Sequence, residues 1–470
     1  LQLHLVKIKM IRNNKYIGYS LSQLGDNFHN YYKNHLKFEL TNAQKRVIKE
    51  IRIDVKNNKQ MNRLLQGDVG SGKTIVALLS MLMAIDNGFQ ACIMAPTEIL
   101  AQQHFTTISK ELEEMDINVN ILTGSKKTKA RRELLEELEN GKIQLLIGTH
   151  ALLEDKVKFH NLGFVVIDEQ HRFGVAQRAK LWKKNKFPPH ILVMTATPIP
   201  RTLSMTLYGD LDVSVIDELP PGRKVIKTLW RSDSSRLKII RFMREQIKVG
   251  RQIYVVFPLI DESAKMDYKN LIEGYDSIVR EFPLPEFQVS VVHGQMKSED
   301  KEYEMNRFVE GVTDIMVATT VIEVGVNVPN ASAMIIESAE RFGLSQLHQL
   351  RGRVGRGSNQ SYCILMSGNK LSNDAKTRLK TLVDTNDGFE IAEVDLKLRG
   401  PGDMMGTKQS GILDFKIADI IKDNKILLYA RKEVDQLLLD DFELSKSENI
   451  NIARFYRPYA RERMGWSRIS

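Results

Sequence analysis

Short apolar segments alternate with amphipathic stretches along most of this chain. Apolar runs that predict strands stand at 63–66, 91–95, 119–122, 144–147, 163–167 and 191–194. Between them, stretches such as 75–85, 98–114 and 127–139 have the composition and spacing of helices. Strands that alternate with helices are typical of a parallel sheet covered on both faces.

The alternation begins again after Leu219-Pro220-Pro221-Gly222, a natural linker. Further strands are predicted at 225–229, 252–257, 288–292, 314–318, 333–337 and 361–366. After residue 370 the pattern becomes helical and irregular. Gly400-Pro-Gly-Asp breaks it, and 425–439 predicts an amphipathic helix. The predicted fold class is therefore α/β, with two tandem parallel-sheet lobes followed by a mainly helical C-terminal segment.

This pattern divides the chain into four parts. Residues 1–36 begin β-like and then become polar and asparagine-rich, which we interpret as a remnant of, or a linker from, an N-terminal domain. Residues 37–219 form the first lobe and 220–370 the second. Residues 371–470 form the helical C-terminal region.

Composition and charge narrow the kind of partner. Of the 470 residues, 42% are hydrophobic and 27% are charged, as in globular proteins with full cores. No apolar run reaches the ~18 residues that a membrane span needs, so no membrane association is expected. A net charge of +10 fits a polyanionic partner, or a generally basic proteome. Cys92 and Cys363 stand in apolar runs, which predicts buried free thiols and suits a reducing cytoplasm.

Residues 67–74 read Gly-Asp-Val-Gly-Ser-Gly-Lys-Thr between a predicted strand and a predicted helix, the context of a phosphate-binding loop. Glycines let backbone amides turn toward an anion, and the helix N-terminus adds further amides. Lys73 would reach the outer phosphates, and the Thr74 hydroxyl would hold magnesium. The residues assigned to the nucleotide here are Gly67, Gly70, Ser71, Gly72, Lys73 and Thr74. The alternative is a glycine-rich turn without a ligand, and the loop alone leaves a kinase, a switch and a motor open.

Another apolar strand ends in two acids, Asp168 and Glu169. A parallel strand delivers its last residues to the sheet edge where ligands bind. Asp168 would hold magnesium, and Glu169 would orient or deprotonate the attacking water. The alternative is an acidic N-cap of a following helix. Thr195 and Thr197 follow the next strand and could hydrogen-bond these acids and relay the state of the nucleotide.

An arginine-rich turn lies in the second lobe, where Gln349-Leu-Arg-Gly-Arg353-Val-Gly-Arg356 stands. Arginines three apart at a glycine-broken turn can reach one anion, so Arg353 and Arg356 are candidate arginine fingers on a γ-phosphate. Such a finger accelerates hydrolysis by ~10³–10⁵. The alternative is a solvated basic loop.

Weaker candidates stand at other predicted strand ends and ahead of the phosphate loop. Hydroxyl and imidazole groups that could position a phosphate backbone belong to Thr97, Thr149, His293 and Thr319, although an ordinary turn explains each alone. Phe38 and Gln44 could sandwich and hydrogen-bond an adenine, and the alternative is a plain helix start. His171, His293 and His348 lack the spacing of metal ligands.

In this order the segments resemble the helicase motifs of superfamily two, from residue 38 to residue 357. The resemblance implies two RecA-like lobes with ATP between them and nucleic acid across the top. By it, Gln44 contacts adenine, Lys73 and Thr74 bind phosphate and magnesium, and Asp168 with Glu169 catalyses hydrolysis. Gln349, Arg353 and Arg356 then close the site.

Two further segments resemble the RecG branched-DNA helicases and the transcription-repair coupling factors. They are Asp168-Glu-Gln-His-Arg-Phe-Gly174 and the stretch from 388 to 411, which is similar to the translocation motif of both. Arg399 and Gln409 fall on the positions that couple lobe movement to pulling on duplex DNA. The start at Phe38-Glu-Leu-Thr-Asn and the early end after the motif favour the RecG type. That family carries a large N-terminal wedge domain, of which only 1–36 could be a remnant here.

The sequence thus predicts an ATP- and magnesium-dependent translocase on double-stranded DNA that remodels branched DNA, such as stalled forks and Holliday junctions, in recombination and repair. A monomer in the bacterial cytoplasm or nucleoid is expected, and protein partners are not predicted. The alternatives are a transcription-repair coupling translocase, an RNA helicase of the same superfamily, and a nucleotide-gated DNA-binding module without turnover. The basic, aromatic tail at 454–466 either touches DNA or packs on the lobes.

Overall fold

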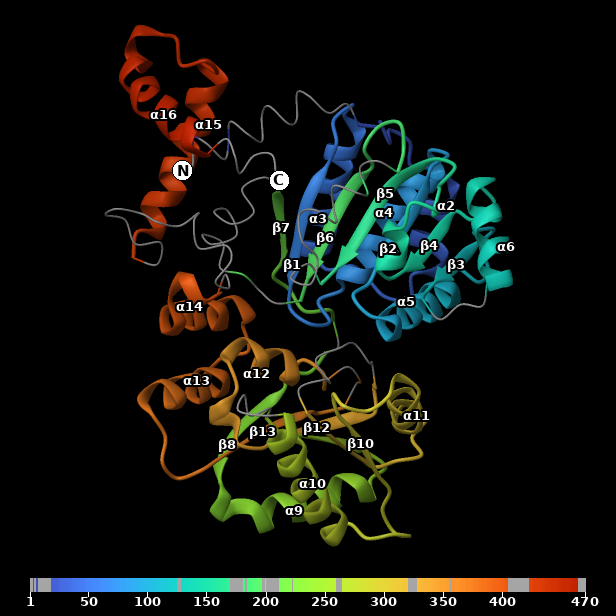
Figure 1. Ribbon diagram of the computed structural model, residues 1–470, viewed down its shortest axis with the longest axis vertical. Helices are drawn as coiled ribbons and strands as arrows, with labels where there is room; N and C mark the ends of the chain where they lie inside the picture. Colours follow the sequence, from blue (N-terminus) through green and yellow to red (C-terminus); the bar gives the residue numbers. More distant parts are fainter. Residues whose placement is uncertain are drawn as a thin grey trace. The chain divides into compact units, whose positions relative to one another are not determined.

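The computed structural model describes residues 3, 6, 18–124, 128–169, 181, 184–196, 199, 211–221, 223–258, 264–319, 328–355, 357, 359–404 and 422–463. They form two compact units (Figure 1). The first unit contains Leu1–Gly67, Ser71–Glu218 and Pro401–Ser470. The second contains Asp68–Gly70 and Leu219–Gly400, so the phosphate loop contributes residues to both.

A seven-stranded sheet with the strand order β3-β4-β2-β5-β6-β1-β7 forms the centre of the first unit. Every strand pair described in it is parallel. The strands are β1 (Asn62–Gly67), β2 (Gln90–Met94), β3 (Val119–Leu122), β4 (Leu145–Gly148), β5 (Leu162–Asp168), β6 (His190–Thr195) and β7 (Asp212–Ile216). Neighbouring residues of each strand alternate between two hydrophobic clusters, because side chains of a strand point to opposite faces.

Helices cover both faces of this sheet. Those along the chain before the C-terminal region are α2 (Asp26–Asn30), a π-helical turn η1 (Tyr31–His35), α3 (Asn42–Lys56), α4 (Lys73–Asp86), α5 (Glu98–Glu111), α6 (Thr128–Glu139) and η2 (His150–Leu153). Helix α4 is apolar nearly all round and buried, since it packs against both the sheet and α3. The C-terminal elements are α15 (Asn424–Asp440), η7 (Ser447–Asn449) and α16 (Ile450–Arg463), with their own small cluster around Leu438 and Ala453.

Residues 18–36 pack on the first unit. Phe28 and Tyr31 are buried in its main cluster. The Asp86 carboxylate at the end of α4 accepts the backbone N–H groups of Gly25, Asn27 and Phe28 at 2.9, 3.1 and 3.0 Å. One ionised side chain therefore satisfies the otherwise unpaired amides at the start of α2.

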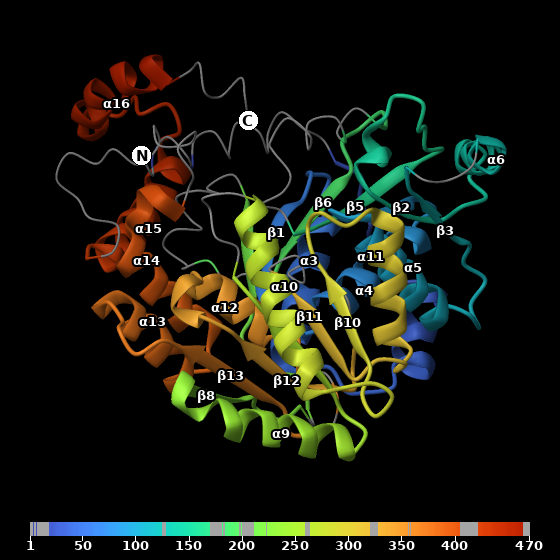
Figure 2. The same cartoon turned by 60° about the horizontal axis from the view of Figure 1, so that its bottom comes forward.

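The second unit has a six-stranded sheet with the order β10-β11-β9-β12-β13-β8, again with parallel pairs throughout the described residues. Figure 2 shows it with its helices. The strands are β8 (Lys227–Ser232), β9 (Gln252–Val256), β10 (Val289–Val292), β11 (Ile315–Ala318), β12 (Ala331–Ile336) and β13 (Tyr362–Ser367). The helices are η4 (Asp233–Ser235), α9 (Arg236–Lys248), α10 (Ala264–Glu281), α11 (Ser298–Val309), η6 (Ala339–Arg341), α12 (Leu344–Arg351), α13 (Asn373–Asp384) and α14 (Gly388–Met404).

The two faces of this second sheet carry different helices. Helices α9 and α10 share a cluster with Ile253, Val255 and their neighbours. On the opposite face, α11, α12 and α13 share a cluster with Tyr254 and Val256. Both sheets are thus covered on two sides, which confirms the α/β class with two parallel-sheet lobes.

The structure also corrects the sequence analysis in places. Strand β7 (Asp212–Ile216), at the edge of the first sheet, was not predicted. The helical pattern predicted after residue 370 includes the described part of the stretch after 388, which is the helix α14. The bend expected at Gly400 is confirmed, with φ 77° and ψ 164° inside that helix. Cys92 and Cys363 are buried and free, and burial raises the pKa of each thiol to about 12. Among the described residues, no helix has the length and apolarity to cross a membrane.

Replacing Asp86 by alanine should loosen residues 18–36 while the sheet stays folded. The change removes the acceptor of three backbone N–H groups. A hydrogen bond to a charged group contributes about 1.5–3 kcal/mol, so we expect amide hydrogen exchange at 25–28 to quicken roughly tenfold or more. Asp155→Ala, at an exposed acid, is the control. Unchanged exchange in Asp86→Ala would show that the apolar contacts alone hold this segment.

Candidate functional site

Three strands of the first sheet bring predicted site residues to one edge. Strand β1 ends at Gly67, β5 at Asp168 and β6 at Thr195. Strand β6 lies between the other two, with Gln66 opposite Thr195 and Asp168 opposite Met194. Because parallel neighbours lie ~4.8 Å apart, the phosphate loop begins within two strand spacings of the acidic pair. The sequence placed these residues at strand ends, and the strand order makes them neighbours.

The glycines of the phosphate loop are required by its backbone. Gly70 and Gly72 have φ angles of +77° and +88°, in the left-handed region that other residues rarely adopt. A Cβ at Gly72 would stand 2.1 Å from Nε2 of Gln44. Lys73 is the first residue of α4, and its buried Nζ donates to the Gly67 carbonyl at 2.7 Å. The ammonium group is thus held beside Gly67, the first residue of the loop.

Gln44 contacts this loop directly. Its Nε2 donates to the Ser71 carbonyl at 2.8 Å, while its Oε1 accepts the N–H of Thr41 at 2.9 Å. Thr41 in turn accepts the Gln44 N–H at 3.2 Å, which completes a capping box at the start of α3. The helix-start interpretation is therefore confirmed, and the adenine role stays a prediction.

Phe38 lies a few residues before this helix. It is half exposed and lines a pocket of about 450 Å³ in the first unit. Tyr32, Lys37 and Lys45 also line it. An aromatic ring with neighbouring cations fits the predicted contact with a base.

Asp168 is paired with a histidine that the sequence analysis missed. Nε2 of His104, on α5, lies 2.8 Å from Oδ2 of Asp168. Burial alone would raise the pKa of Asp168, but the His104 hydrogen bond and the charges of His104 and Lys73 outweigh it, so the pKa lies below its ordinary value. The signal was present, since Ala101, His104 and Ile108 share the buried face of α5. An imidazole on that face needs a polar partner.

Glu169 follows Asp168 in a strained conformation. Its φ of +54° is unusual for a residue with a side chain. Such strain persists only where the surroundings enforce it, and it gathers at functional sites.

The residues of this edge fit a magnesium–triphosphate group. The Ser71 hydroxyl is buried and has no hydrogen-bond partner within the described residues. Lys73 supplies a positive charge and Asp168 an ionised carboxylate. Magnesium prefers oxygen ligands and usually takes few from the protein, because phosphates and water complete its shell. Asp168 with the Thr74 hydroxyl is a suitable protein contribution.

The remaining strand-end residues of the first unit differ in their surroundings. Thr97 is the N-cap of α5, with its hydroxyl accepting the Leu100 N–H at 3.4 Å, so the ordinary structural role explains it. The Thr149 hydroxyl is buried without a partner in the part of the chain that the structure describes. Thr149 therefore keeps a free donor at the end of β4.

In the second unit, His293 and Thr319 directly follow the adjacent strands β10 and β11. The Thr319 N–H donates to the Val292 carbonyl at 3.3 Å, and the Thr319 hydroxyl is buried with no partner among the described atoms. Burial, followed by the charge of Lys301, lowers the pKa of His293. The pair brings polar groups to one sheet edge, and the phosphate contacts stay a prediction.

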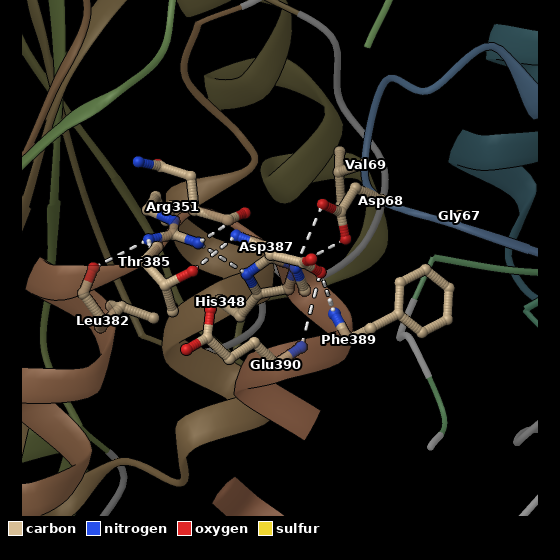
Figure 3. Close-up of polar contacts among 12 residues, drawn as sticks. Gly67, Asp68, Val69, His348, Arg351, Leu382, Thr385, Asp387, Phe389 and Glu390 are labelled. Atoms are coloured by element: carbon tan, nitrogen blue, oxygen red, sulfur yellow. Dashed lines mark hydrogen bonds and ion pairs between the residues drawn. The ribbon is translucent and has the colours of Figure 1, made fainter. Parts of the chain in front are cut away.

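Helix α12 carries Gln349, and the turn after it carries Arg353. Figure 3 shows two further residues of α12 that sequence reasoning did not use for this purpose. His348 lies 3.2 Å from Asp68 of the phosphate loop, and Arg351 donates to His348 at 3.0 Å. Arg351 is 2% exposed. From the sequence, His348 was expected only not to be a metal ligand.

Arg223, directly after the linker, also reaches the loop segment of the second unit. It donates to the Val69 carbonyl at 2.6 Å and to the Gly355 carbonyl at 3.0 Å. Burial lowers the pKa of Arg223, against the charge of Asp68, but an arginine remains protonated. No motif in the sequence analysis pointed to this residue.

Three models of known families match consecutive parts of the chain. Residues 41–206 match the DEAD/DEAH box helicase model and residues 236–358 the helicase conserved C-terminal domain. Residues 385–470 match the model described as ATP-dependent DNA helicase RecG, domain 3, C-terminal. Curated proteins called ATP-dependent DNA helicase RecG, from Synechocystis sp. and Bacillus subtilis, are both 51% identical over 417 and 406 residues.

The chain is a RecG homologue. The alignments with the Synechocystis and Bacillus proteins cover 89% and 86% of it, and 50% and 59% of those proteins. The chain thus spans about half the length of the curated relatives it matches. A solved structure of RecG bound to a three-way DNA junction is 43% identical, with a TM-score of 0.75 over 90% of this chain and 55% of that one. The helicase MrfA bound to DNA, at 16% identity, 79% and 57% coverage and a TM-score of 0.57, shares the fold alone.

The RecG-specific region begins within the second unit. Nε of Arg399 on α14 lies 3.0 Å from the carboxylate of Asp395. Burial raises the pKa of Asp395, against the opposing charge and hydrogen bond of Arg399. Arg399 therefore forms an ion pair in which its own side chain is partly exposed and that of Asp395 is buried. Three predicted residues, Thr197, Arg356 and Gln409, lie outside the described residues.

Two glycines that flank α4 allow a matched test of the loop geometry. Gly72→Ala places a methyl group against Gln44 at a φ of +88°, whereas Gly88→Ala has a similar φ of +79° and no atom within 4 Å. Left-handed strain costs about 1–2 kcal/mol in both, so Gly72→Ala should lower the free energy of unfolding of the first unit more. This free energy is measured by urea unfolding, with hydrogen exchange of the β1 and β6 amides as the probe. When Gln44 is also replaced by alanine, the extra destabilisation by Gly72→Ala relative to Gly88→Ala should shrink. If Gly72→Ala and Gly88→Ala lower the free energy of unfolding equally with Gln44 present, the predicted clash with Gln44 is contradicted.

Proposed function

We propose that this chain is an ATP-driven motor on double-stranded DNA that unwinds and remodels branched DNA in recombination and repair, in the bacterial cytoplasm. The observation that carries the proposal is the RecG domain 3 match at 385–470, attached to two helicase-type lobes in one chain. The relatives called ATP-dependent DNA helicase RecG, and the RecG structure bound to a three-way junction, support ATP and DNA as substrates. A monomer is part of the proposal.

The ATP chemistry follows from the edge of the first sheet. Inward amides of the phosphate loop bind the triphosphate, with Lys73 neutralising the outer phosphates. The amide of Gln44 and the ring of Phe38 recognise the base. Glu169 accepts a proton from, or orients, the attacking water. Gln349, Arg353 and Arg356 stabilise the charge that develops on the transferred phosphoryl group.

Magnesium belongs to the same proposal. The Thr74 hydroxyl and the Asp168 carboxylate would hold it, and when bound it neutralises charge on the phosphate oxygens. His104 orients the Asp168 carboxylate through its 2.8 Å hydrogen bond. An ionised Asp168 suits this role, because protonation would remove the ligand.

The DNA contacts are proposed to be phosphate contacts. Thr149, His293 and Thr319 present polar groups at the carboxyl ends of strands, and Thr97, Thr195 and Thr197 are proposed as further contacts in the first lobe. Such groups bind the backbone without reading the base sequence. Arg399 and Gln409 couple the ATP cycle to movement along the duplex. Arg399 would exchange Asp395 for its working partner.

Hydrolysis should depend on Lys73, Glu169 and DNA together. Glu169→Gln removes a base and should lower kcat by roughly 10²–10⁴-fold. Lys73→Ala removes charge stabilisation worth roughly 10²–10³-fold in rate. Phosphate release with and without DNA measures both, with exposed Lys142→Ala as the control. Turnover that DNA leaves unchanged in the unaltered chain would contradict a motor, and absence of turnover would favour the binding module.

The choice of nucleic acid separates this function from its rivals. We expect forked DNA and linear duplex to stimulate hydrolysis, and RNA to do so at least tenfold less. The apparent binding constant for DNA, taken from the DNA concentration that gives half-maximal stimulation, should fall linearly with salt on a log–log plot, because phosphate contacts release counterions. Greater stimulation by RNA would favour an RNA helicase. Equal stimulation by forked and linear DNA would instead favour a general duplex translocase, such as the transcription-repair coupling type.

A further inference from the structure

Asp68 is an unexpected residue within an anion-binding loop. A carboxylate beside a triphosphate is repelled by it, so Asp68 does not serve phosphate binding directly. Its two oxygens are instead occupied within the second unit. Oδ1 lies 3.2 Å from Nε2 of His348, and Oδ2 accepts the N–H of Gly388 at 3.3 Å (Figure 3). The side chain thus contacts α12 and the first residue of α14 together.

The direction of these hydrogen bonds is fixed by Arg351. Its guanidinium donates to Nδ1 of His348 at 3.0 Å and has no acceptor atom, so Nδ1 is the unprotonated nitrogen. The ring proton is therefore on Nε2, which donates to Asp68. Arginine, imidazole and carboxylate form one directed chain, and His348 is only 6% exposed within it.

The other donors of Arg351 hold the turn between α13 and α14. They reach the carbonyls of Leu382 and Thr385, both at 2.8 Å, and that of Asn386 at 3.4 Å. Asp387 then caps α14 by accepting the N–H of Phe389 at 2.8 Å. The turn 385–388 is consequently held by hydrogen bonds from Arg351 to its carbonyls and from its Gly388 N–H to Asp68.

Satisfying carbonyls is an ordinary role for a buried arginine, but that role requires no residue of the phosphate loop. Asp68 stands between Gly67, whose carbonyl binds Lys73, and Val69, whose carbonyl binds Arg223. A rearrangement of this backbone around phosphates therefore moves the carboxylate that α14 and His348 share.

We propose that Asp68 is a positioning residue through which nucleotide in the phosphate loop sets the geometry of the turn 385–388 and the start of α14, with His348 and Arg351 as the connection. The proposal rests on the proposed function, because α14 carries Arg399 of the coupling segment. It adds a specific physical connection from the nucleotide to that segment.

The test measures amide hydrogen exchange of a peptide covering 385–392, with and without a non-hydrolysable ATP analogue and magnesium, at saturation judged from each variant's own binding curve. In the unaltered chain the analogue should change the exchange rate by roughly tenfold, the equivalent of one hydrogen bond. Asp68→Asn and His348→Ala should each abolish this nucleotide-dependent difference, and the double variant should go no further. His348→Gln, which retains an N–H donor toward Asp68, should restore part of it.

Ser372→Ala is the matched control, because it removes the N-cap of α13 without touching Asp68. It should raise exchange equally with and without the analogue. The same equal rise in Asp68→Asn and His348→Ala would mean a merely structural role and would overturn the proposal. A nucleotide-dependent difference that persists unchanged in these two variants would also overturn it. The measurement needs nucleotide but no DNA, so it stands apart from a failure of DNA-stimulated hydrolysis.

Discussion

The parallel pairing of the strands is the constraint on which the rest of the molecule depends. A parallel strand must be followed by a crossover, so every strand of a sheet ends at the same edge. In the first unit this rule brings Gly67, Asp168 and Thr195 to neighbouring positions, although Gly67 and Thr195 are 128 positions apart in the chain. In the second it does the same for His293 and Thr319. The chemistry gathers at these edges because helices cover both faces.

Charged groups at such an edge are buried and therefore need partners. Lys73 donates to a loop carbonyl, Asp168 is paired with His104, and Arg351 satisfies carbonyls at the end of α13. An unpaired ion in these positions would lose its hydration with no interaction to compensate for it, which costs several kcal/mol. The partners fix the orientation of each functional group before any ligand arrives. The Gln44 amide is oriented in the same way, because it hydrogen-bonds both the cap of α3 and the phosphate loop.

This arrangement also suggests why the RecG region is attached where it is. Helix α14 begins at Gly388, whose N–H binds a phosphate-loop residue, and the region that matches RecG domain 3 begins at 385. The proposed coupling segment directly follows the turn 385–388. A change in the backbone of the phosphate loop would therefore reach this segment through a few hydrogen bonds.

The sequence by itself determined the two α/β lobes, nearly all strand positions and the phosphate-loop, acidic and arginine segments, because these are local patterns of period, glycine placement and strand ends. It missed β7, whose short alternating run is weak evidence for a strand. Only the tertiary structure decided that His104 serves Asp168 and that His348, Arg351 and Asp68 form one chain. Those partners lie 64 and 280 residues apart, and no local pattern records a contact between segments that meet only after the sheet has formed.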